Sequence, residues 1–130
     1  MFISFEGIEG SGKTTQINAL SSWLKSTGKD VVITKEPGGT AVGTIIRQLL
    51  LDKNTEIKDP KSELLLFFAD RLEHCKQVIE PALAKGKWVI CDRYIESTYA
   101  YQVGGRQLST STFDQIASLI ELYPDQTFLL

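Results

Sequence analysis

The sequence lacks any apolar run long enough to cross a bilayer. Its longest apolar stretch runs only from Leu64 to Ala69, whereas a membrane-spanning helix needs about 20 residues. No charged segment followed by an apolar one opens the chain, as a secretory leader would. We therefore expect neither a membrane span nor a signal peptide, and we expect a cytoplasmic location.

Cysteine and histidine are also scarce. Cys75 and Cys91 are the two cysteines, and His74 is the one histidine. Their spacing matches neither a zinc site nor a disulfide framework. We expect both thiols to be half-buried, and His74 to lie on the surface or flank of a helix.

The sequence also has no large excess of either positive or negative charge. Lysine and arginine total 14 and the acidic residues 16, which leaves a net charge of -2 without any basic cluster. A nucleic acid or an anionic membrane therefore has little electrostatic support as a partner. A length of 130 residues predicts a single domain, residues 1–130, with a real core.

Residues 7–14 fit the phosphate-loop pattern, in which a glycine, four residues of any kind and Gly-Lys precede Ser or Thr. Gly10 and Gly12 remove the Cβ atoms that would keep backbone N–H groups away from a phosphate. Lys13 adds a mobile charge, and the Thr14 hydroxyl can bind Mg²⁺. The segment therefore predicts a polyphosphate site.

The rest of the chain alternates between strand-like and helix-like segments. The expected strands are 2–5, 31–34, 88–91 and 126–130, and the expected helices are 15–27, 41–50, 60–84, 94–101 and 112–120. The alternation predicts an α/β fold with a parallel sheet. We expect 31–33 to be buried on both faces and 126–130 to be a central strand, so that its uncovered face indicates missing structure.

Local signals refine the helices. We expect Thr40, Asp59 and Ser111 to be N-caps, and Pro60 to occupy a first helical position. Pro81 is expected to end or kink its helix, and 102–106 to break the one before it. The apolar residues of 41–50 are expected to face the core, namely Val42, Ile45, Ile46, Leu49 and Leu50.

Two polar segments follow predicted strands, where ligands bind in open α/β sheets. One is the turn 35–40, Lys-Glu-Pro-Gly-Gly-Thr, although a plain connector would look similar. The other begins with Asp92 and Arg93. Asp92 is a candidate magnesium-side carboxylate or a helix N-cap, and the planar Arg93 guanidinium can grip a phosphate.

These motifs, together with the Phe67-x-x-x-Arg71 pair, occur in the order seen in thymidylate kinases, and the chain resembles that family over its whole length. The resemblance implies the nucleoside monophosphate kinase version of the phosphate-loop fold, a three-layer arrangement with helices on both sides of a parallel sheet. It implies phosphoryl transfer from ATP to deoxythymidine monophosphate (dTMP), giving dTDP and ADP for dTTP synthesis. It also implies a homodimer.

The resemblance further implies how ATP is held. Thr14 and Asp92 would serve Mg²⁺, and the catalytic residues would be Lys13, Arg93 and Glu9. The ATP-binding residues would be Gly7, Glu9, Gly10, Ser11, Gly12, Lys13, Thr14 and Thr15.

For the acceptor, the resemblance implies that Phe67 stacks on thymine, Arg71 and Thr98 fix the base, Tyr101 lies against the sugar and Arg93 clamps the phosphate. Core packing is nearly as good an interpretation of Phe67 from the sequence alone. The complete set implied for the acceptor is Glu9, Glu36, Pro37, Phe67, Arg71, Arg93, Ser97, Thr98, Tyr101 and Gln102.

Two features depart from the family pattern. Residues 9–11 contain no arginine, so the resemblance implies arginines supplied by a mobile lid, which we expect beyond residue 130. Val103 stands where the family often has glycine. The alternatives are another phosphate-loop nucleotide kinase, or a truncated nucleotide-binding module without turnover.

Overall fold

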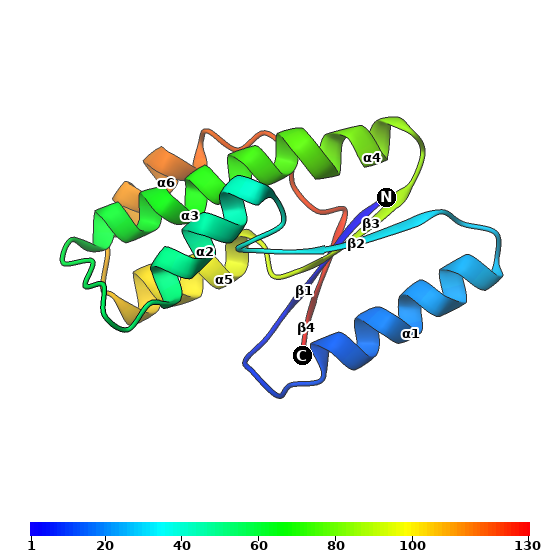
Figure 1. Ribbon diagram of the computed structural model, residues 1–130, viewed down its shortest axis with the longest axis horizontal. Helices are drawn as coiled ribbons and strands as arrows, with labels where there is room; N and C mark the ends of the chain where they lie inside the picture. The colour runs from blue at the N-terminus through cyan, green and yellow to red at the C-terminus, as the bar shows by residue number, and fades with distance from the viewer.

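Four parallel strands form the sheet of the computed structural model, which describes residues 1–130 (Figure 1). The strands are β1 (Phe2–Glu6), β2 (Val31–Lys35), β3 (Trp88–Asp92) and β4 (Gln126–Leu129), in the order β2-β3-β1-β4. Asp92 pairs in register with Phe5 of β1 and with Lys35 of β2. The carboxyl ends of these strands therefore meet at one edge, as the predicted parallel sheet requires.

The helical segments alternate with the strands. They are α1 (Lys13–Ser26), α2 (Ala41–Leu51), α3 (Pro60–His74), the π-helical η1 (Cys75–Ile79), α4 (Glu80–Ala84), α5 (Ile95–Tyr99), the π-helical η2 (Ala100–Gly105) and α6 (Thr110–Ala117). No helix has the length and apolar composition that crossing a bilayer requires.

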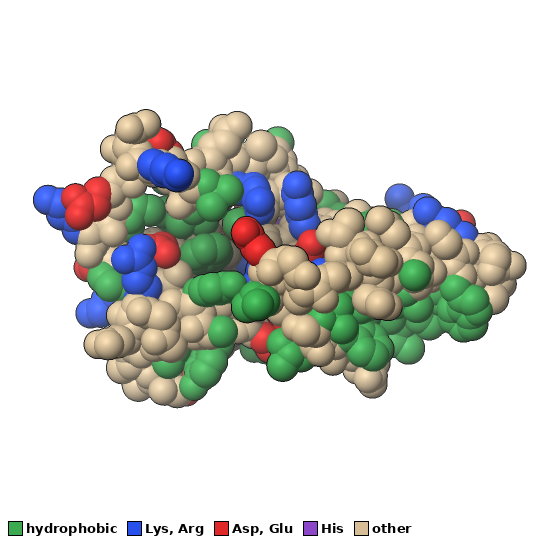
Figure 2. All heavy atoms as spheres, turned by 90° about the horizontal axis from the view of Figure 1, so that it is seen from below, with side chains coloured by type: hydrophobic (Ala, Val, Ile, Leu, Met, Phe, Trp, Pro, Cys, Tyr) green, Lys and Arg blue, Asp and Glu red, His purple; other side chains and the backbone are tan.

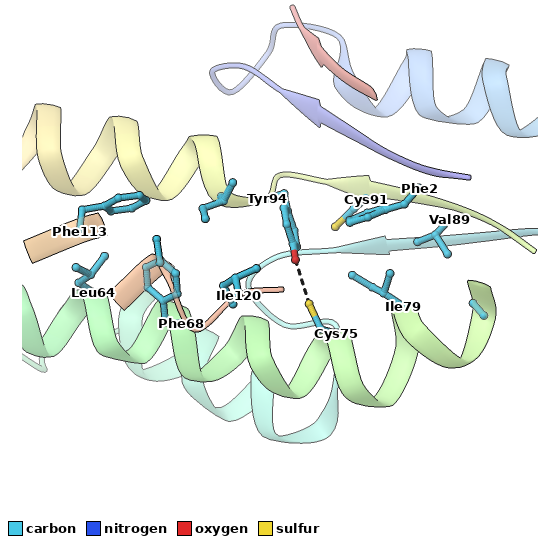
Figure 3. Close-up of a cluster of buried hydrophobic side chains, with 13 residues drawn as sticks. Phe2, Leu64, Phe68, Cys75, Ile79, Val89, Cys91, Tyr94, Phe113 and Ile120 are labelled. Carbon is cyan, nitrogen blue, oxygen red and sulfur yellow. Dashed lines mark hydrogen bonds between the residues drawn. The ribbon is translucent and has the colours of Figure 1, made fainter. Parts of the chain in front are cut away.

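Alternate residues of the central strands pack in opposite directions, because side chains of a strand point to opposite faces. Ile3, Phe5 and Ile90 pack with α1 in one apolar cluster. Phe2 and Val89 belong to a larger cluster that includes side chains of α3, α5 and α6 (Figure 3). Helix α1 therefore covers one face of the sheet, and α3 and α4 cover the other (Figure 1).

Two of the three expected N-caps are confirmed. The Thr40 hydroxyl accepts from Gly43 N at 2.9 Å, and Asp59 accepts from Lys61 N at 2.8 Å. The prediction for Ser111 was wrong, because the Ser109 hydroxyl caps α6 by accepting from Thr112 N. The helix therefore starts and ends earlier than expected, and the buried Ile120 lies beyond it.

Helical structure continues through both places where the sequence predicted an irregularity, and the expected helix 60–84 does reach Ala84. The chain passes from α3 through η1 into α4, so the hydrogen-bond pattern widens before Pro81, which lacks an N–H, instead of ending there. The expected break at 102–106 was wrong, because η2 continues helically to Gly105. Buried Gln102 donates through Nε2 to Glu63 Oε1 at 2.9 Å, which holds η2 against α3.

Several segments expected to be buried are exposed. Strand β2 is an edge strand, so Ile33 is 45% exposed, and β4 lies at the opposite edge of these four strands. Helix α2 packs mainly on α3, and only its Gly43 and Ile46 are buried. The predicted core positions Val42, Ile45 and Leu49 therefore face outward.

Candidate functional site

The phosphate loop connects β1 to α1 at the carboxyl edge of the sheet. Gly7, Gly10 and Gly12 have φ values of 141°, 78° and 93°, a region that side chains with a Cβ rarely adopt. Lys13 is the first residue of α1 and is largely buried. Its Nζ donates to Gly7 O at 2.9 Å and to Ile8 O at 2.8 Å, so its positive charge lies within the loop.

A cavity of about 470 Å³, the loop cavity, opens over this segment. It has no hydrophobic lining residue. Six of the predicted loop residues line it together with Asp92 and Arg93, namely Glu9, Gly10, Gly12, Lys13, Thr14 and Thr15. Gly7 and Ser11 do not line it; a Cβ on Gly7 would lie 2.8 Å from Ser11 Oγ, so these two pack against each other.

Asp92 and Thr14 lie together in this cavity with properties that suit a hard cation. Asp92 Oδ1 is buried without a hydrogen-bond partner. The alternative N-cap role of Asp92 was wrong, because the N-cap position of α5 is Tyr94 and carries no side-chain cap bond. A buried carboxylate oxygen that lacks a donor, lining the same cavity as a threonine, fits a magnesium ligand set.

A second cavity of about 680 Å³, the Arg71 cavity, lies between α2, α3, α5 and η2. All ten residues expected around the acceptor line it: Glu9, Glu36, Pro37, Phe67, Arg71, Arg93, Ser97, Thr98, Tyr101 and Gln102. Phe67 is only partly buried there, whereas its neighbour Phe68 belongs to the core, so core packing does not account for Phe67.

The two cavities share part of their lining. Glu9, Glu36, Arg47 and Arg93 border both. Charged side chains of both signs gather around the hollow between the part of the molecule that carries α1 and the part that carries α2 and α5 (Figure 2). Groups bound in the two cavities would therefore meet between two acids and two arginines.

Arg71 is fixed on nearly every side. Its Nε donates to Glu36 Oε2 at 2.7 Å, and its Nη2 donates to Thr98 Oγ1 at 2.9 Å. The guanidinium carbon lies 5.3 Å and 4.8 Å from the ring centroids of Phe68 and Tyr94. Only Nη1 has no partner, and Arg71 is 1% exposed. The side chain thus presents one free, buried donor group beside the cavity.

Arg93 is held differently. Its backbone has a φ of 72°, its Nη1 donates to Ser97 Oγ at 3.1 Å, and its guanidinium lies over the Tyr101 ring. The Ser97 hydroxyl donates in turn to buried Glu6, which also accepts from Tyr94 N at 2.7 Å. Burial raises the pKa of Glu6. Glu6 therefore anchors the segment that carries Arg93.

The expectations for histidine and cysteine were wrong. His74 is 0% exposed, with Nδ1 2.7 Å from Glu36 Oε1 and Nε2 2.6 Å from Thr34 Oγ1. Cys75 and Cys91 are both buried rather than half-buried. The sequence did not reveal these environments, because the residues that enclose these side chains lie far away along the chain.

Glu36, His74 and Cys91 are close enough to hold a metal ion. Their chemistry argues against one. Both imidazole nitrogens of His74 have partners, and burial holds the pKa of Cys91 well above its usual range, so it remains a thiol. Cys91 Sγ also donates to Arg93 O. A metal would need the thiolate and a free nitrogen.

Sequence reasoning missed several residues of the site. Glu6 is the charged last residue of an otherwise mostly apolar strand, and Arg47 lies off the apolar side of α2, so both carried a weak signal. Glu63 and Arg106 form an ion pair of 2.9 Å at the Arg71 cavity and carried none. Arg47 donates to Pro37 O at 3.0 Å and so connects α2 to the turn after β2.

The fold is that of the phosphate-loop nucleoside monophosphate kinases: a phosphate loop at the carboxyl edge of a parallel sheet, beside a second cavity that the same edge helps to form. The family model described as thymidylate kinase matches residues 5–130. The chain belongs to the thymidylate kinase family.

Individual similar proteins carry the same family name. The chain is 49% identical to a thymidylate kinase of Bifidobacterium longum (strain DJO10A), over 100% of this chain and 66% of that protein. It is 51% identical to one of Prochlorococcus marinus (strain NATL1A), over 99% and 65%. A crystal structure of thymidylate kinase from Ehrlichia chaffeensis matches with a TM-score of 0.89 and 48% identity, over 99% of this chain and 70% of that one. The chain thus spans about two thirds of the length of the curated relatives.

Proposed function

We propose that the protein transfers the γ-phosphoryl group of ATP to dTMP, giving dTDP and ADP, a step in dTTP synthesis. One observation carries the proposal: the loop cavity and the Arg71 cavity share four lining residues, Glu9, Glu36, Arg47 and Arg93. Family membership supports the same conclusion, because the matching relatives are named thymidylate kinases.

The donor nucleotide would lie in the loop cavity. Backbone N–H groups of the loop and the amino terminus of α1 favour an anion there. The ATP-binding residues in this proposal are Gly7, Glu9, Gly10, Ser11, Gly12, Lys13, Thr14 and Thr15. Lys13 would exchange its two carbonyl partners for phosphate oxygens, and its charge would stabilise the transferring group.

Magnesium fits beside the loop. Thr14 and Asp92 would hold it, because Asp92 Oδ1 is a buried oxygen without a donor and Thr14 lines the same cavity. When bound with ATP, the ion would neutralise phosphate charge and orient the γ-phosphoryl group.

The acceptor would lie in the Arg71 cavity. Phe67 would stack on thymine, which contributes about 0.5 to 1.5 kcal/mol beyond area burial and orients the base without selecting it. Selection would come from hydrogen bonds, since Arg71 Nη1 is a buried donor without a partner and Thr98 holds the same guanidinium.

Tyr101 would contact the sugar of the acceptor. The residues that would support these groups are Ser97, Gln102, Glu36 and Pro37.

The reaction itself needs positioning and charge neutralisation more than a protein nucleophile. An oxygen of the dTMP phosphate would attack the γ-phosphorus, and the bond to the β–γ bridging oxygen would break. Arg93 would hold the acceptor phosphate, since it borders both cavities, and Glu9 would accept from the 3′-hydroxyl of the sugar. Lys13, Arg93 and Glu9 are therefore the proposed catalytic residues.

The proposed partners are small molecules and a second copy of the chain. Val42, Ile45 and Leu49 form an exposed apolar stripe on α2, which supports a homodimer that covers it. The net charge of -2 gives no support to nucleic acid or membrane binding, and a cytoplasmic enzyme is the proposal that fits a nucleotide substrate.

The test is ADP release by the protein at its natural length, with Mg²⁺-ATP and a panel of nucleoside monophosphates. The proposal predicts fastest turnover with dTMP. Turnover that prefers another monophosphate would support a different nucleotide kinase. Thermal stabilisation by dTMP without any product would support the alternative of a binding module.

A further inference from the structure

His74, the single histidine of the chain, lies between the end of β2 and the turn that follows it. It lines neither the loop cavity nor the Arg71 cavity. His74 extends from α3, with Nε2 2.6 Å from the Thr34 hydroxyl of β2 and Nδ1 2.7 Å from the Glu36 carboxylate. It is 0% exposed and Glu36 is 4% exposed. A buried polar group that makes two bonds to distant segments has its orientation fixed by them.

The partners assign the protons. The Glu36 carboxylate can only accept, so Nδ1 of His74 carries a proton and donates it. Arg71 Nε supplies the second carboxylate oxygen of Glu36 with its donor. Both oxygens are thus occupied from opposite sides, and the plane of the Glu36 carboxylate is set by His74 and Arg71 together.

The hydrogen bonds from His74 to Glu36 and from Arg71 to Glu36 lead to Arg71 Nη1, the donor without a partner beside the Arg71 cavity. With Nε on Glu36 and Nη2 on Thr98, the guanidinium plane of Arg71 is fixed, and this fixes the direction of unpartnered Nη1. A free arginine side chain has many rotamers. Because the fixed Glu36 carboxylate already holds Arg71 in one rotamer, less conformational entropy is lost when a ligand binds, and Nη1 keeps one direction.

The backbone is shaped around the same ring. A Cβ on Gly39 would lie 2.4 Å from His74 Cδ2, and a Cβ on Gly43 would lie 2.1 Å from Asp70 Oδ1. Asp70 also accepts from Gly38 N at 3.0 Å. Two α3 side chains, one turn apart, therefore hold the turn that carries Glu36.

We propose that His74 is a positioning residue for recognition of the acceptor base: it holds Glu36, which holds Arg71, so that Nη1 points at the edge of the base. The inference rests on the proposed function. Thymine presents a carbonyl oxygen at position 4, where cytosine presents an amino group, so a fixed N–H donor favours thymine. Loss of His74 should therefore reduce selectivity between bases and not only affinity.

The experiment compares variants of the natural-length protein in kcat/KM for dTMP and for the cytosine counterpart dCMP at saturating ATP. His74→Leu fills the space and removes both hydrogen bonds. It should lower kcat/KM for dTMP by about 10-fold or more, mainly through KM, and should reduce the preference for dTMP over dCMP. The KM for ATP should stay within about 2-fold.

Two further variants separate positioning from simple stability. His74→Asn places an N–H donor where Nδ1 lies and should restore most of the selectivity, whereas Thr34→Val should weaken it slightly. Glu73→Gln, an exposed change one position away on α3, serves as the control and should alter nothing. If His74→Leu does not fold, the ranking of wild type, Thr34→Val and His74→Asn decides the question.

The outcomes distinguish the two proposals. A wild-type protein that does not phosphorylate dTMP overturns the proposed function. Normal wild-type activity with an unchanged dTMP:dCMP preference in folded His74→Leu overturns the inference alone; if that variant does not fold, an unchanged preference in Thr34→Val does so. A nitrogen-15 NMR spectrum is independent of turnover: the signal that His74→Asn removes should be that of a protonated Nδ1, and an unprotonated Nδ1 would contradict the assigned bonds.

Discussion

The phosphate loop comes from one contiguous segment, whereas the Arg71 cavity is assembled from side chains of several distant elements. In the loop, the glycine backbone and one lysine supply the anion-binding groups, and Lys13 donates hydrogen bonds to residues five and six positions away. Around Arg71, Glu36 and Thr98 lie 35 and 27 positions away. A group that any nucleotide carries can be bound by local backbone, but a particular base needs side chains whose orientation the whole fold sets.

The largest effect should come from the loop. Lys13→Met keeps the side-chain stem and removes the charge, so turnover should fall by about 10²-fold or more, because a transition-state cation is lost. The KM for dTMP should hardly change. Steady-state kinetics in both substrates measures this; a raised dTMP KM with normal kcat would show that the two regions are not separable as described.

A smaller effect is expected where the two cavities meet. Arg93→Ala removes charge-assisted hydrogen bonds and should raise the KM for dTMP by about 10- to 100-fold. Arg93→Lys should recover part of it, because the charge returns without the planar fork. Normal dTMP affinity in Arg93→Ala would remove this residue from the acceptor side.

The close fit between α3 and the turn after β2 can be tested with one methyl group. Gly39→Ala places a Cβ 2.4 Å from the His74 ring, and overpacking of this kind costs about 1 to 3 kcal/mol. Gly104→Ala, where nothing lies within 4 Å, is the matched control. Chemical denaturation should show a loss of stability only in Gly39→Ala, and equal stability of the two variants would argue against the fit.

The smallest effect concerns Asp70. Burial raises the pKa of this carboxyl above its ordinary value of 3.8, so the folded state binds the proton more tightly than the unfolded state. Its contribution to stability is complete below that value and is lost as pH rises through the raised pKa. Asp70→Asn cannot lose a proton, so its stability relative to wild type should improve as the pH rises above the ordinary carboxyl pKa of 3.8. Parallel pH profiles of melting temperature would contradict this.

The sequence predicted the local features of the molecule well. The phosphate loop, the strand before it, and the Thr40 and Asp59 caps follow from neighbouring residues, and the parallel sheet follows from the alternation of elements. Phe67 and Arg71 lie four positions apart on α3 and both line the Arg71 cavity, as regular helical spacing allows, but their binding roles were implied by the resemblance to thymidylate kinases.

Burial was predicted less well, because it depends on partners far along the chain. His74 meets Glu36 across 38 positions, and no local pattern shows that meeting. Val42, Ile45 and Leu49 have the spacing of a core-facing stripe, but α2 packs on α3 by other residues. The edge position of β2 likewise follows from strand order, which the sequence alone does not determine.

Direct phosphoryl transfer between two bound nucleotides requires that both cavities act as one site. Calorimetric titration of the natural-length protein with adenosine and thymidine joined 5′ to 5′ through a polyphosphate chain tests this most directly. We predict that one molecule binds per chain, more tightly than ATP or dTMP alone, and that it excludes both. Affinity no greater than that of dTMP, or simultaneous binding of ATP, would contradict a shared site at Glu9 and Arg93.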